Sequence, residues 1–211
     1  MNRPICPSTS GPPNAARPHR SSWQPALGLL SLLLLSACSL TRPVRDTAAR
    51  HLLDATVPAR ATTAAQPALA VAKPTLPTYL DRPQLVARGA AGELRVLDEQ
   101  LWSEPLDAGI ARVLATNLAR LTGSAAILPA SGFVALEYDR LLELRLERCE
   151  PGPDGSLVLE ASWKLQPVTG PDTPFRSFRT LVPGETTTAA AQVAATNEAL
   201  ARLARAIAAG L

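Results

Sequence analysis

The sequence predicts an α+β fold of two layers, in which a mostly antiparallel sheet carries two amphipathic helices on one face. Residues 136–165 alternate for much of their length between apolar and polar side chains, which is the period of a half-buried strand. Two other stretches, residues 103–121 and 188–211, repeat apolar residues at spacings of three and four, as amphipathic helices do. Strands segregated from two helices favour this architecture.

An uncharged and largely apolar run, residues 26–40, precedes the predicted domain and follows a basic segment. Its 15 residues are fewer than the about 20 that a membrane-spanning helix needs. The run is therefore interpreted as the apolar part of a signal peptide. We expect residues 1–37 to be removed, residues 38–49 to form a tether, and residues 50–211 to form one domain.

The charge balance of the predicted mature chain argues against a nucleic-acid partner. The sequence carries 21 basic and 18 acidic residues, for a net charge of +3. The excess is accounted for by Arg3, Arg17 and Arg20, which all lie in the predicted leader. The mature chain is then formally neutral and lacks the basic excess of nucleic-acid binders.

Short strands and turns are expected in the first part of the domain. Residues 50–55 and 68–73 suit strands, and the Ala/Thr-rich stretch between them, interrupted by prolines, suits a loop. Pro83 disfavours helix before it, so an extended turn should lead into a strand at residues 84–88. Glycines at 89 and 92 then mark a hairpin, with residues 93–97 as the partner strand.

Helix signals open and close the next segment. Ser103 is the expected N-cap, Glu104 suits the positive helix end, and Pro105 is tolerated in the first turn. Gly123 is the expected stop.

The remaining elements follow from alternation and turn residues. Residues 136–150 and 157–165 should form a long hairpin around a Pro/Gly-rich turn, followed by a strand at residues 175–182. The closing helix should begin near Thr188.

The end of the apolar run, Leu35-Ser36-Ala37-Cys38, resembles the bacterial lipobox. The resemblance implies that the Cys38 thiol receives a lipid and that the signal is cut just before it. A Cys suits this chemistry because thiolate is a strong nucleophile near neutral pH. Ser39 stands where an Asp signals inner-membrane retention in enteric-type sorting, so placement at the outer membrane is favoured.

Four segments together resemble the PqiC/YmbA-type lipoproteins, the auxiliary lipoprotein component of ABC-type lipid transporters that carry MCE-domain proteins. The resemblance covers about residues 50–211. The segments are residues 76–86 (Leu-Pro-Thr-Tyr-Leu-Asp-Arg-Pro-Gln-Leu-Val), 102–106 (Trp-Ser-Glu-Pro-Leu), 51–53 and 199–208.

This resemblance implies a non-catalytic docking or adaptor role in membrane integrity. The protein would sit at the periplasmic face of the outer membrane, held by its lipid anchor, and would bind an MCE-domain protein of the same transport system. The resemblance leaves open whether the protein forms a homo-oligomer. The alternative is a lipid-binding or outer-membrane assembly chaperone, whose signature would be a deep apolar pocket between helix and sheet.

Candidate partner-binding residues come from the two most specific segments: Tyr79, Asp81, Arg82 and Trp102. Each has a simpler interpretation. Asp81 or Arg82 could fix the turn at Pro83 by bonding the local backbone. Trp102 and Tyr79 could pack against the domain instead of binding a partner.

Catalytic and metal chemistry find little support in the sequence. His51 is the only histidine after the leader, so it has no ligand set for zinc. The chain contains no Gly-x-Ser-x-Gly elbow and no phosphate-binding glycine loop. Cys149, alone once Cys38 carries lipid, is interpreted as a half-buried strand residue, with a bridge to a second chain as the alternative. We therefore predict no catalytic residue, no metal and no cofactor.

Overall fold

The predicted long hairpin is the centre of the fold. A computed structural model describes residues 46–61, 68–130 and 137–211 of the chain. In it, β6 (Arg140–Pro151) pairs antiparallel with β7 (Leu157–Pro167), and β7 pairs antiparallel with β8 (Arg176–Val182). The pairing of β6 with β7 shifts register between Leu146 and Arg148, so a bulge interrupts the alternation near the end of β6.

Two three-residue strands extend this sheet beyond β6. The strand β2 (Leu69–Val71) runs parallel to β6 on one side and to β5 (Ile127–Pro129) on the other. The five-stranded sheet therefore has the order β5-β2-β6-β7-β8 and is mixed. The α+β class is confirmed, whereas the expectation of one mostly antiparallel sheet needs correction, because β5 was not foreseen and β2 pairs in parallel.

A second sheet of three strands forms at the other end of the described domain. The strands β3 (Gln84–Arg88) and β4 (Leu94–Trp102) make the predicted hairpin, although β4 runs five residues beyond its expected end. The first strand, β1 (Ala49–His51), pairs parallel with the end of β4. His51 is thereby set opposite Trp102, which fixes where the segment before the domain enters the fold.

The first described helix, α2 (Leu106–Thr122), begins three residues after the predicted Ser103 cap. Its N-cap is Pro105, and no side chain caps it, so the expected role of Ser103 is wrong. The cause lies in the chain path, because the Ser103 N–H bonds the His51 carbonyl at 2.7 Å and ties this residue to β1. Gly123 ends the helix with a φ of 69°, as the stop signal predicted.

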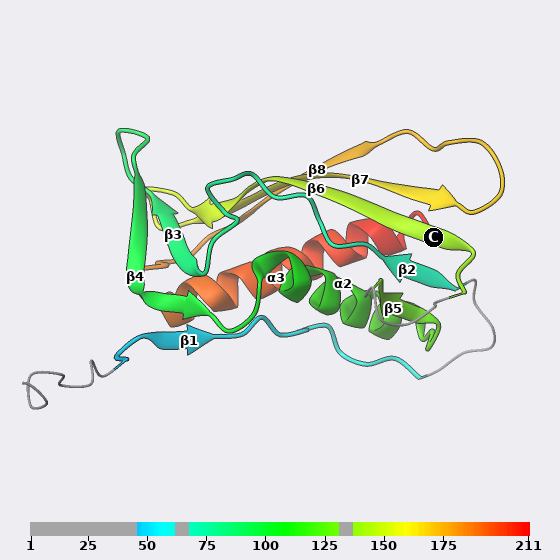
Figure 1. Cartoon of the computed structure of the whole chain (residues 1–211), viewed down its shortest axis with the longest axis horizontal. Helices are drawn as coiled ribbons and strands as arrows, with labels where there is room; N and C mark the ends of the chain where they lie inside the picture. The colour runs from blue at the N-terminus through cyan, green and yellow to red at the C-terminus, as the bar shows by residue number, and fades with distance from the viewer. Residues whose placement is uncertain (1–45, 62–67, 131–136) are drawn as a thin grey trace, which may run out of the picture. The chain divides into compact units, whose positions relative to one another are not determined.

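The second described helix, α3 (Ala189–Ala208), begins where the sequence indicated. The Thr188 side chain accepts a hydrogen bond from the Ala191 N–H at 3.2 Å and caps the first turn. Both helices pack against the five-stranded sheet and against each other (Figure 1). The interface is filled by fully buried side chains: Ile110, Leu114, Leu118, Leu142, Leu159, Leu200, Leu203 and Ile207.

Residues 52–61, which we call the covering segment, run over the helices on the side opposite the five-stranded sheet (Figure 1). Leu53 and Val57 are buried there. Helix side chains satisfy its backbone: Asn197 accepts from the Asp54 N–H at 3.0 Å, and Asn117 accepts from the Val57 N–H at 3.2 Å. The covering segment thus shields the helix face that is turned away from the sheet, while the sheet and the helices form the two expected layers.

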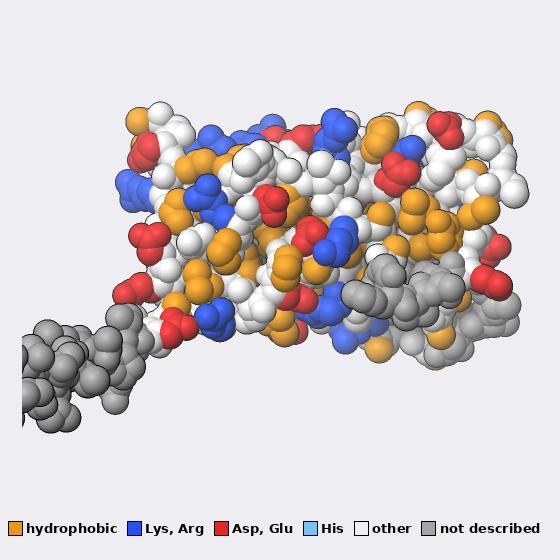
Figure 2. All heavy atoms as spheres, in the orientation of Figure 1, with side chains coloured by type: hydrophobic (Ala, Val, Ile, Leu, Met, Phe, Trp, Pro, Cys, Tyr) orange, Lys and Arg blue, Asp and Glu red, His pale blue; other side chains and the backbone are white. Residues whose placement is uncertain are grey.

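The surface of the described domain carries both signs of charge. On the face in Figure 2, Lys and Arg side chains are interspersed with Asp and Glu side chains. Such mixing agrees with the formal neutrality of residues 38–211. No helix in the described part of the chain combines the length and hydropathy that a membrane span requires.

Candidate functional site

The first segment that supplied candidate residues folds into a tight turn ahead of β3. The Pro77 carbonyl accepts hydrogen bonds from the N–H groups of Leu80 at 2.9 Å and Asp81 at 3.2 Å. Leu80 is 2% exposed and anchors the turn in the core. Pro83 lacks an N–H to donate, but its carbonyl accepts from the Trp102 N–H at 2.7 Å. This last bond joins the first segment to the second.

A cavity of about 370 Å³ lies at this junction. Three of the four candidate residues, Asp81, Arg82 and Trp102, line it, although Tyr79 does not. The remaining lining comes from the turn and from the start of α2: Pro83, Ser103, Glu104, Pro105 and Leu106. We call this cavity the junction pocket. Its lining shows that the β3–β4 hairpin brings together two segments separated in the sequence.

Trp102 gives the junction pocket an apolar wall. The side chain is 8% exposed, so the indole packs into the domain and only a small part of it is open to the pocket. This placement agrees with the packing interpretation and also leaves the ring as part of the lining.

Among the charged side chains of the junction pocket, Glu104 has an ion-pair partner in the described residues, whereas Asp81 and Arg82 do not. Asp81 is exposed, and within the described residues neither it nor Arg82 forms an ion pair or a side-chain hydrogen bond to the turn. The Arg82 Nε atom is buried and without a hydrogen-bond partner. Glu104, in contrast, is bound by Arg112 at 2.5 Å. The turn is thus held by backbone bonds, and the Arg82 guanidinium keeps unused donors at the pocket.

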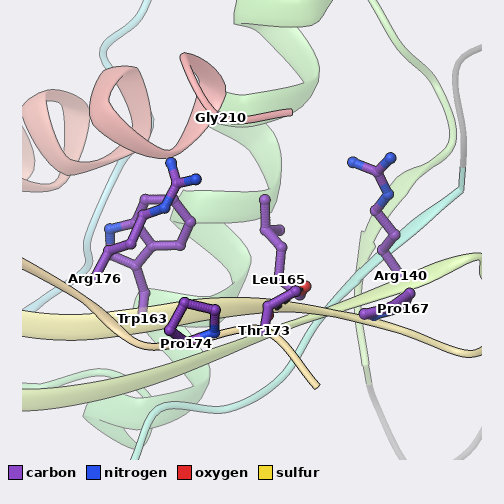
Figure 3. A pocket seen from close by; sticks show the side chains of 8 residues that line it. All are labelled: Arg140, Trp163, Leu165, Pro167, Thr173, Pro174, Arg176 and Gly210. Carbon is purple, nitrogen blue, oxygen red and sulfur yellow. Dashed lines mark hydrogen bonds between the residues drawn. The ribbon is translucent and has the colours of Figure 1, made fainter. Parts of the chain in front are cut away.

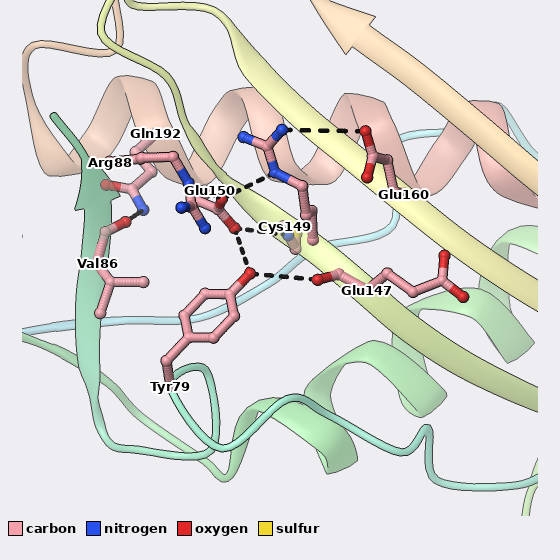
Figure 4. Close-up of polar contacts among 9 residues, drawn as sticks. Tyr79, Val86, Arg88, Glu147, Cys149, Glu150, Glu160 and Gln192 are labelled. Atoms are coloured by element: carbon pink, nitrogen blue, oxygen red, sulfur yellow. Dashed lines mark hydrogen bonds and ion pairs between the residues drawn. The ribbon is translucent and has the colours of Figure 1, made fainter. Parts of the chain in front are cut away.

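Tyr79 points to a different place, a polar cluster between the two sheets (Figure 4). Its hydroxyl donates to a Glu150 carboxylate oxygen at 2.8 Å and also lies 3.3 Å from the Glu147 carbonyl. The Arg88 guanidinium lies over the Tyr79 ring, 5.8 Å from its centre. Tyr79 is therefore engaged in packing and hydrogen bonding within the domain.

Glu150 is the centre of that cluster, and its side chain is fully buried. Arg88 and Arg148 each donate through Nε, at 2.9 and 3.1 Å, and the Cys149 N–H donates at 3.1 Å. Burial alone would raise the pKa of Glu150, but these hydrogen bonds and the one from Tyr79 together hold it below its ordinary value. Burial and the bond to Glu150 raise the pKa of Tyr79. The carboxylate is thus saturated, and the cluster stabilises structure and does not present an acid or a base.

Glu150 was not singled out from the sequence, although an unbroken alternation with Leu142, Leu144 and Leu146 would place position 150 on the apolar face of the strand. The bulge between Leu146 and Arg148 shifts the alternation by one residue, so Cys149 takes the core face opposite Leu159. Glu150 then lies on the other face of the strand, where Tyr79 and Arg88 bind and cover it. The signal in the sequence was a carboxylate in phase with the leucines of the buried face, where an ionised side chain is rare unless it is paired.

The remaining candidates lie in ordinary environments or outside the described residues. His51 shares a 2.7 Å hydrogen bond with Gln100 at the end of β1. Cys149 is 6% exposed, more buried than expected, and burial raises its pKa to about 12. No group of three or more His, Cys, Asp or Glu side chains in the described part is placed to hold a metal. Cys38 lies outside the described residues.

Comparison with known proteins places this domain among relatives. The model of a family described as "ABC-type transport auxiliary lipoprotein component" matches residues 51–208. None of the curated proteins matches the chain significantly.

Solved structures share the fold. A crystal structure of a Xanthomonas campestris protein assigned to the family model DUF330 superposes with a TM-score of 0.64 at 22% identity, covering 76% of this chain and 93% of that one. A crystal structure titled "uncharacterized protein" gives a TM-score of 0.63 at 18% identity, with coverages of 78% and 98%. A weaker likeness, with a TM-score of 0.38 at 17% identity and coverages of 71% and 92%, is to a PelC dodecamer from Paraburkholderia phytofirmans.

Proposed function

This chain belongs to the family of ABC-type transport auxiliary lipoprotein components, and we propose that it is the non-catalytic docking subunit of an intermembrane lipid transporter. In this proposal, lipid on Cys38 holds the domain at the periplasmic face of the outer membrane. The domain binds an MCE-domain protein of the same system and so supports membrane integrity. ATP hydrolysis and the membrane channel belong to other subunits.

The junction pocket is the observation that carries the docking proposal. Two segments distant in the sequence supply Asp81, Arg82 and Trp102 to one cavity. An exposed carboxylate, a guanidinium without an ion-pair partner among the described residues and an apolar wall are the groups by which interfaces obtain both orientation and buried area. The pocket therefore suits a protruding side chain of a protein partner.

The alternative function, a chaperone that encloses an acyl chain beneath the helices, is less well supported. Such a chaperone needs an apolar pocket between helix and sheet, wide enough for a lipid tail. In this domain that space holds side chains such as Leu118, Leu159 and Leu203, each fully buried. A packed interior favours a docking role.

The docking proposal is tested by exchanging one pocket guanidinium in the full lipoprotein. Arg82→Gln removes the charge and keeps much of the side-chain length. We expect at least about a tenfold loss of the MCE-domain protein that co-purifies from native membranes, because a charge-assisted contact at an interface is worth about 1.5–3 kcal/mol. Arg95→Gln is the matched control, since Arg95 lies on β4, does not line the junction pocket and has a 71% exposed side chain.

A photocrosslinking residue at Ser103, which lines the pocket, should capture the MCE-domain protein, whereas the same residue at position 95 should not. Unchanged co-purification of Arg82→Gln, together with no crosslink from position 103, would contradict the docking surface. Equal losses of co-purifying protein in Arg82→Gln and Arg95→Gln would show that the loss comes from the changed net charge and not from the junction pocket.

The anchor is tested separately. Cys38→Ser removes the thiol that would carry the lipid, so the variant should leave the membrane fraction, while wild-type protein should gain the mass of lipid at its new amino terminus. Wild-type protein without added lipid mass, or found soluble in the periplasm, would overturn the anchor.

A further inference from the structure

A second cavity, of about 310 Å³, lies where α3 ends and β7 turns towards β8 (Figure 3). None of its lining residues belongs to the junction pocket. We call it the arginine pocket, because Arg140 and Arg176 stand on its two sides with Leu165 between them (Figure 3). Trp163, Pro167, Thr173, Pro174 and Gly210 complete the lining.

Neither guanidinium of the arginine pocket is neutralised by a carboxylate side chain among the described residues. Arg140 donates to the Leu211 backbone oxygen at 3.2 Å through one Nη atom. Arg176 lies over the Trp163 ring, 5.3 Å from its centre. Most of their donors are therefore free to bind an anion, and guanidinium pairs bind phosphate with two parallel hydrogen bonds each.

The stacking of Arg176 on Trp163 depends on a glycine. A Cβ at position 210 would lie 2.7 Å from an Arg176 Nη atom and 3.3 Å from the Trp163 ring. The absence of that carbon lets the guanidinium rest on the indole at the pocket rim. A stacked guanidinium loses less freedom on binding a ligand than an unconstrained one.

The rest of the arginine pocket is apolar. Trp163, Leu165 and the prolines form its floor and walls. The loop that contributes Thr173 and Pro174 begins and ends with exposed apolar residues, Val168 at 60% and Phe175 at 53% exposure. A free inorganic anion would leave this apolar surface uncovered, whereas an amphiphile would cover it.

We propose that the arginine pocket binds the phosphate group of one phospholipid molecule. The phosphate lies between Arg140 and Arg176, and the first part of the acyl chains lies against Trp163 and Leu165. The volume is at the lower end of the range for small-molecule sites, so the chains continue over the exposed loop residues Val168 and Phe175. This site does not depend on the junction pocket.

The test uses the full lipoprotein, purified from native membranes in a neutral detergent and weighed by native mass spectrometry. Wild-type protein should retain one phospholipid, and Arg140→Gln combined with Arg176→Gln should reduce that retention by at least about tenfold. Arg145→Gln combined with Arg179→Gln is the matched control, since it removes the same charge from exposed positions of β6 and β8. Added dioleoylphosphatidylglycerol should rebind to wild type, whereas dioleoylglycerol, which lacks the phosphate, should not.

Circular dichroism and a thermal melt show whether the double variant is folded. If the variant is folded and retains as much lipid as the control, the arginines only neutralise the carbonyl-rich end of α3, and the proposal is overturned. If wild type carries inorganic phosphate and no lipid, the pocket binds free anions, and the proposed phospholipid ligand is wrong. Equal rebinding of dioleoylglycerol would also overturn it. Native mass spectrometry measures lipid retention on the lipoprotein alone, with no MCE-domain protein present. Its outcome is therefore independent of the docking test.

Discussion

The Tyr79 hydroxyl donates a 2.8 Å hydrogen bond to the buried Glu150 carboxylate, although the two residues lie 71 positions apart in the sequence. The bond links the turn before β3 to the end of β6, and it therefore ties the two sheets together. Arg88 on β3 reaches the same carboxylate at 2.9 Å. Glu150 thus holds the small sheet and the junction pocket beside it in register with the larger sheet.

Glu150→Gln should lower the free energy of unfolding at pH 7 by about 2–4 kcal/mol, because Arg88 and Arg148 lose the charge that compensates their partial burial. Urea unfolding measures the loss. Glu147→Gln is the control, since Glu147 is exposed on the same strand, and it should cost less than about 0.5 kcal/mol. Similar losses in the two variants would contradict the role given to Glu150.

The same carboxylate predicts how stability depends on pH. The pKa of Glu150 is lowered in the folded protein, so the folded state binds fewer protons there than the unfolded state. Its contribution to stability is present above the ordinary value of 4.5 and is lost as the pH falls through the lowered value. Urea unfolding between pH 3 and 6 should therefore fall less steeply with acid in Glu150→Gln than in wild type. Parallel curves would show that Glu150 does not contribute.

Asn117→Ala should loosen the covering segment from the helices. The Asn117 side chain is fully buried, and removal of its oxygen leaves the Val57 N–H without its acceptor. We expect a loss of about 1–3 kcal/mol in the free energy of unfolding and faster hydrogen exchange at the Val57 amide. Thr116→Ala, one position away, removes a hydroxyl that bonds only its own helix and should leave that amide protected.

Gly123→Ala should destabilise the domain by about 1 kcal/mol, because a φ of 69° costs an L-residue with a Cβ roughly that much. Gly123→Asn should cost less, since Asn tolerates this conformation better. Thermal unfolding of the three proteins gives the order. An alanine variant as stable as wild type would contradict the assigned helix end.

Cys149 should resist thiol reagents until the protein unfolds. With a pKa of about 12, only about one part in ten thousand of the thiol is ionised at pH 8, and burial blocks access to it. Labelling of the mature lipoprotein with Ellman's reagent should be slow in buffer and complete in urea. Rapid labelling in buffer, or a disulfide-linked dimer on a non-reducing gel, would show an exposed Cys149.

Local periodicity predicted the elements that are long enough to show it. The apolar stripe over residues 188–211 predicted α3, which ends at Ala208. The alternation of Leu142, Leu144 and Leu146 predicted β6 of the long hairpin. Both patterns arise within one element, so the sequence of that element suffices. The three-residue strand β5 is too short to show a period and was not foreseen. The strand β2 lies within the expected residues 68–73, but its parallel pairing with β5 and β6 is set by distant partners.

Part of the candidate site could also be predicted, because a predicted local element brings its residues together. Asp81, Arg82 and Trp102 came from two distinctive segments, and the β3–β4 hairpin, itself predicted, brings these segments to one pocket. Tyr79 was grouped with them by sequence proximity, but the turn directs it towards Glu150. The bulge that turns Glu150 to the face met by Tyr79 and Arg88 leaves no mark in the sequence. The arginine pocket unites residues from three strands and the end of α3, so only the folded chain reveals it.

The parallel pairing of Ala49–His51 with the end of β4 has a mechanical consequence for a protein held by its amino-terminal side. In the proposed docking role, tension between that side and a partner bound at the junction pocket would run along β1. The hydrogen bonds between β1 and β4 would then bear the load together in shear instead of breaking one after another. Because the His51 carbonyl bonds the Ser103 N–H at the pocket wall, the force bypasses the helices and the large sheet. In the proposed docking role, the bulk of the domain would therefore carry little of the tension between anchor and partner.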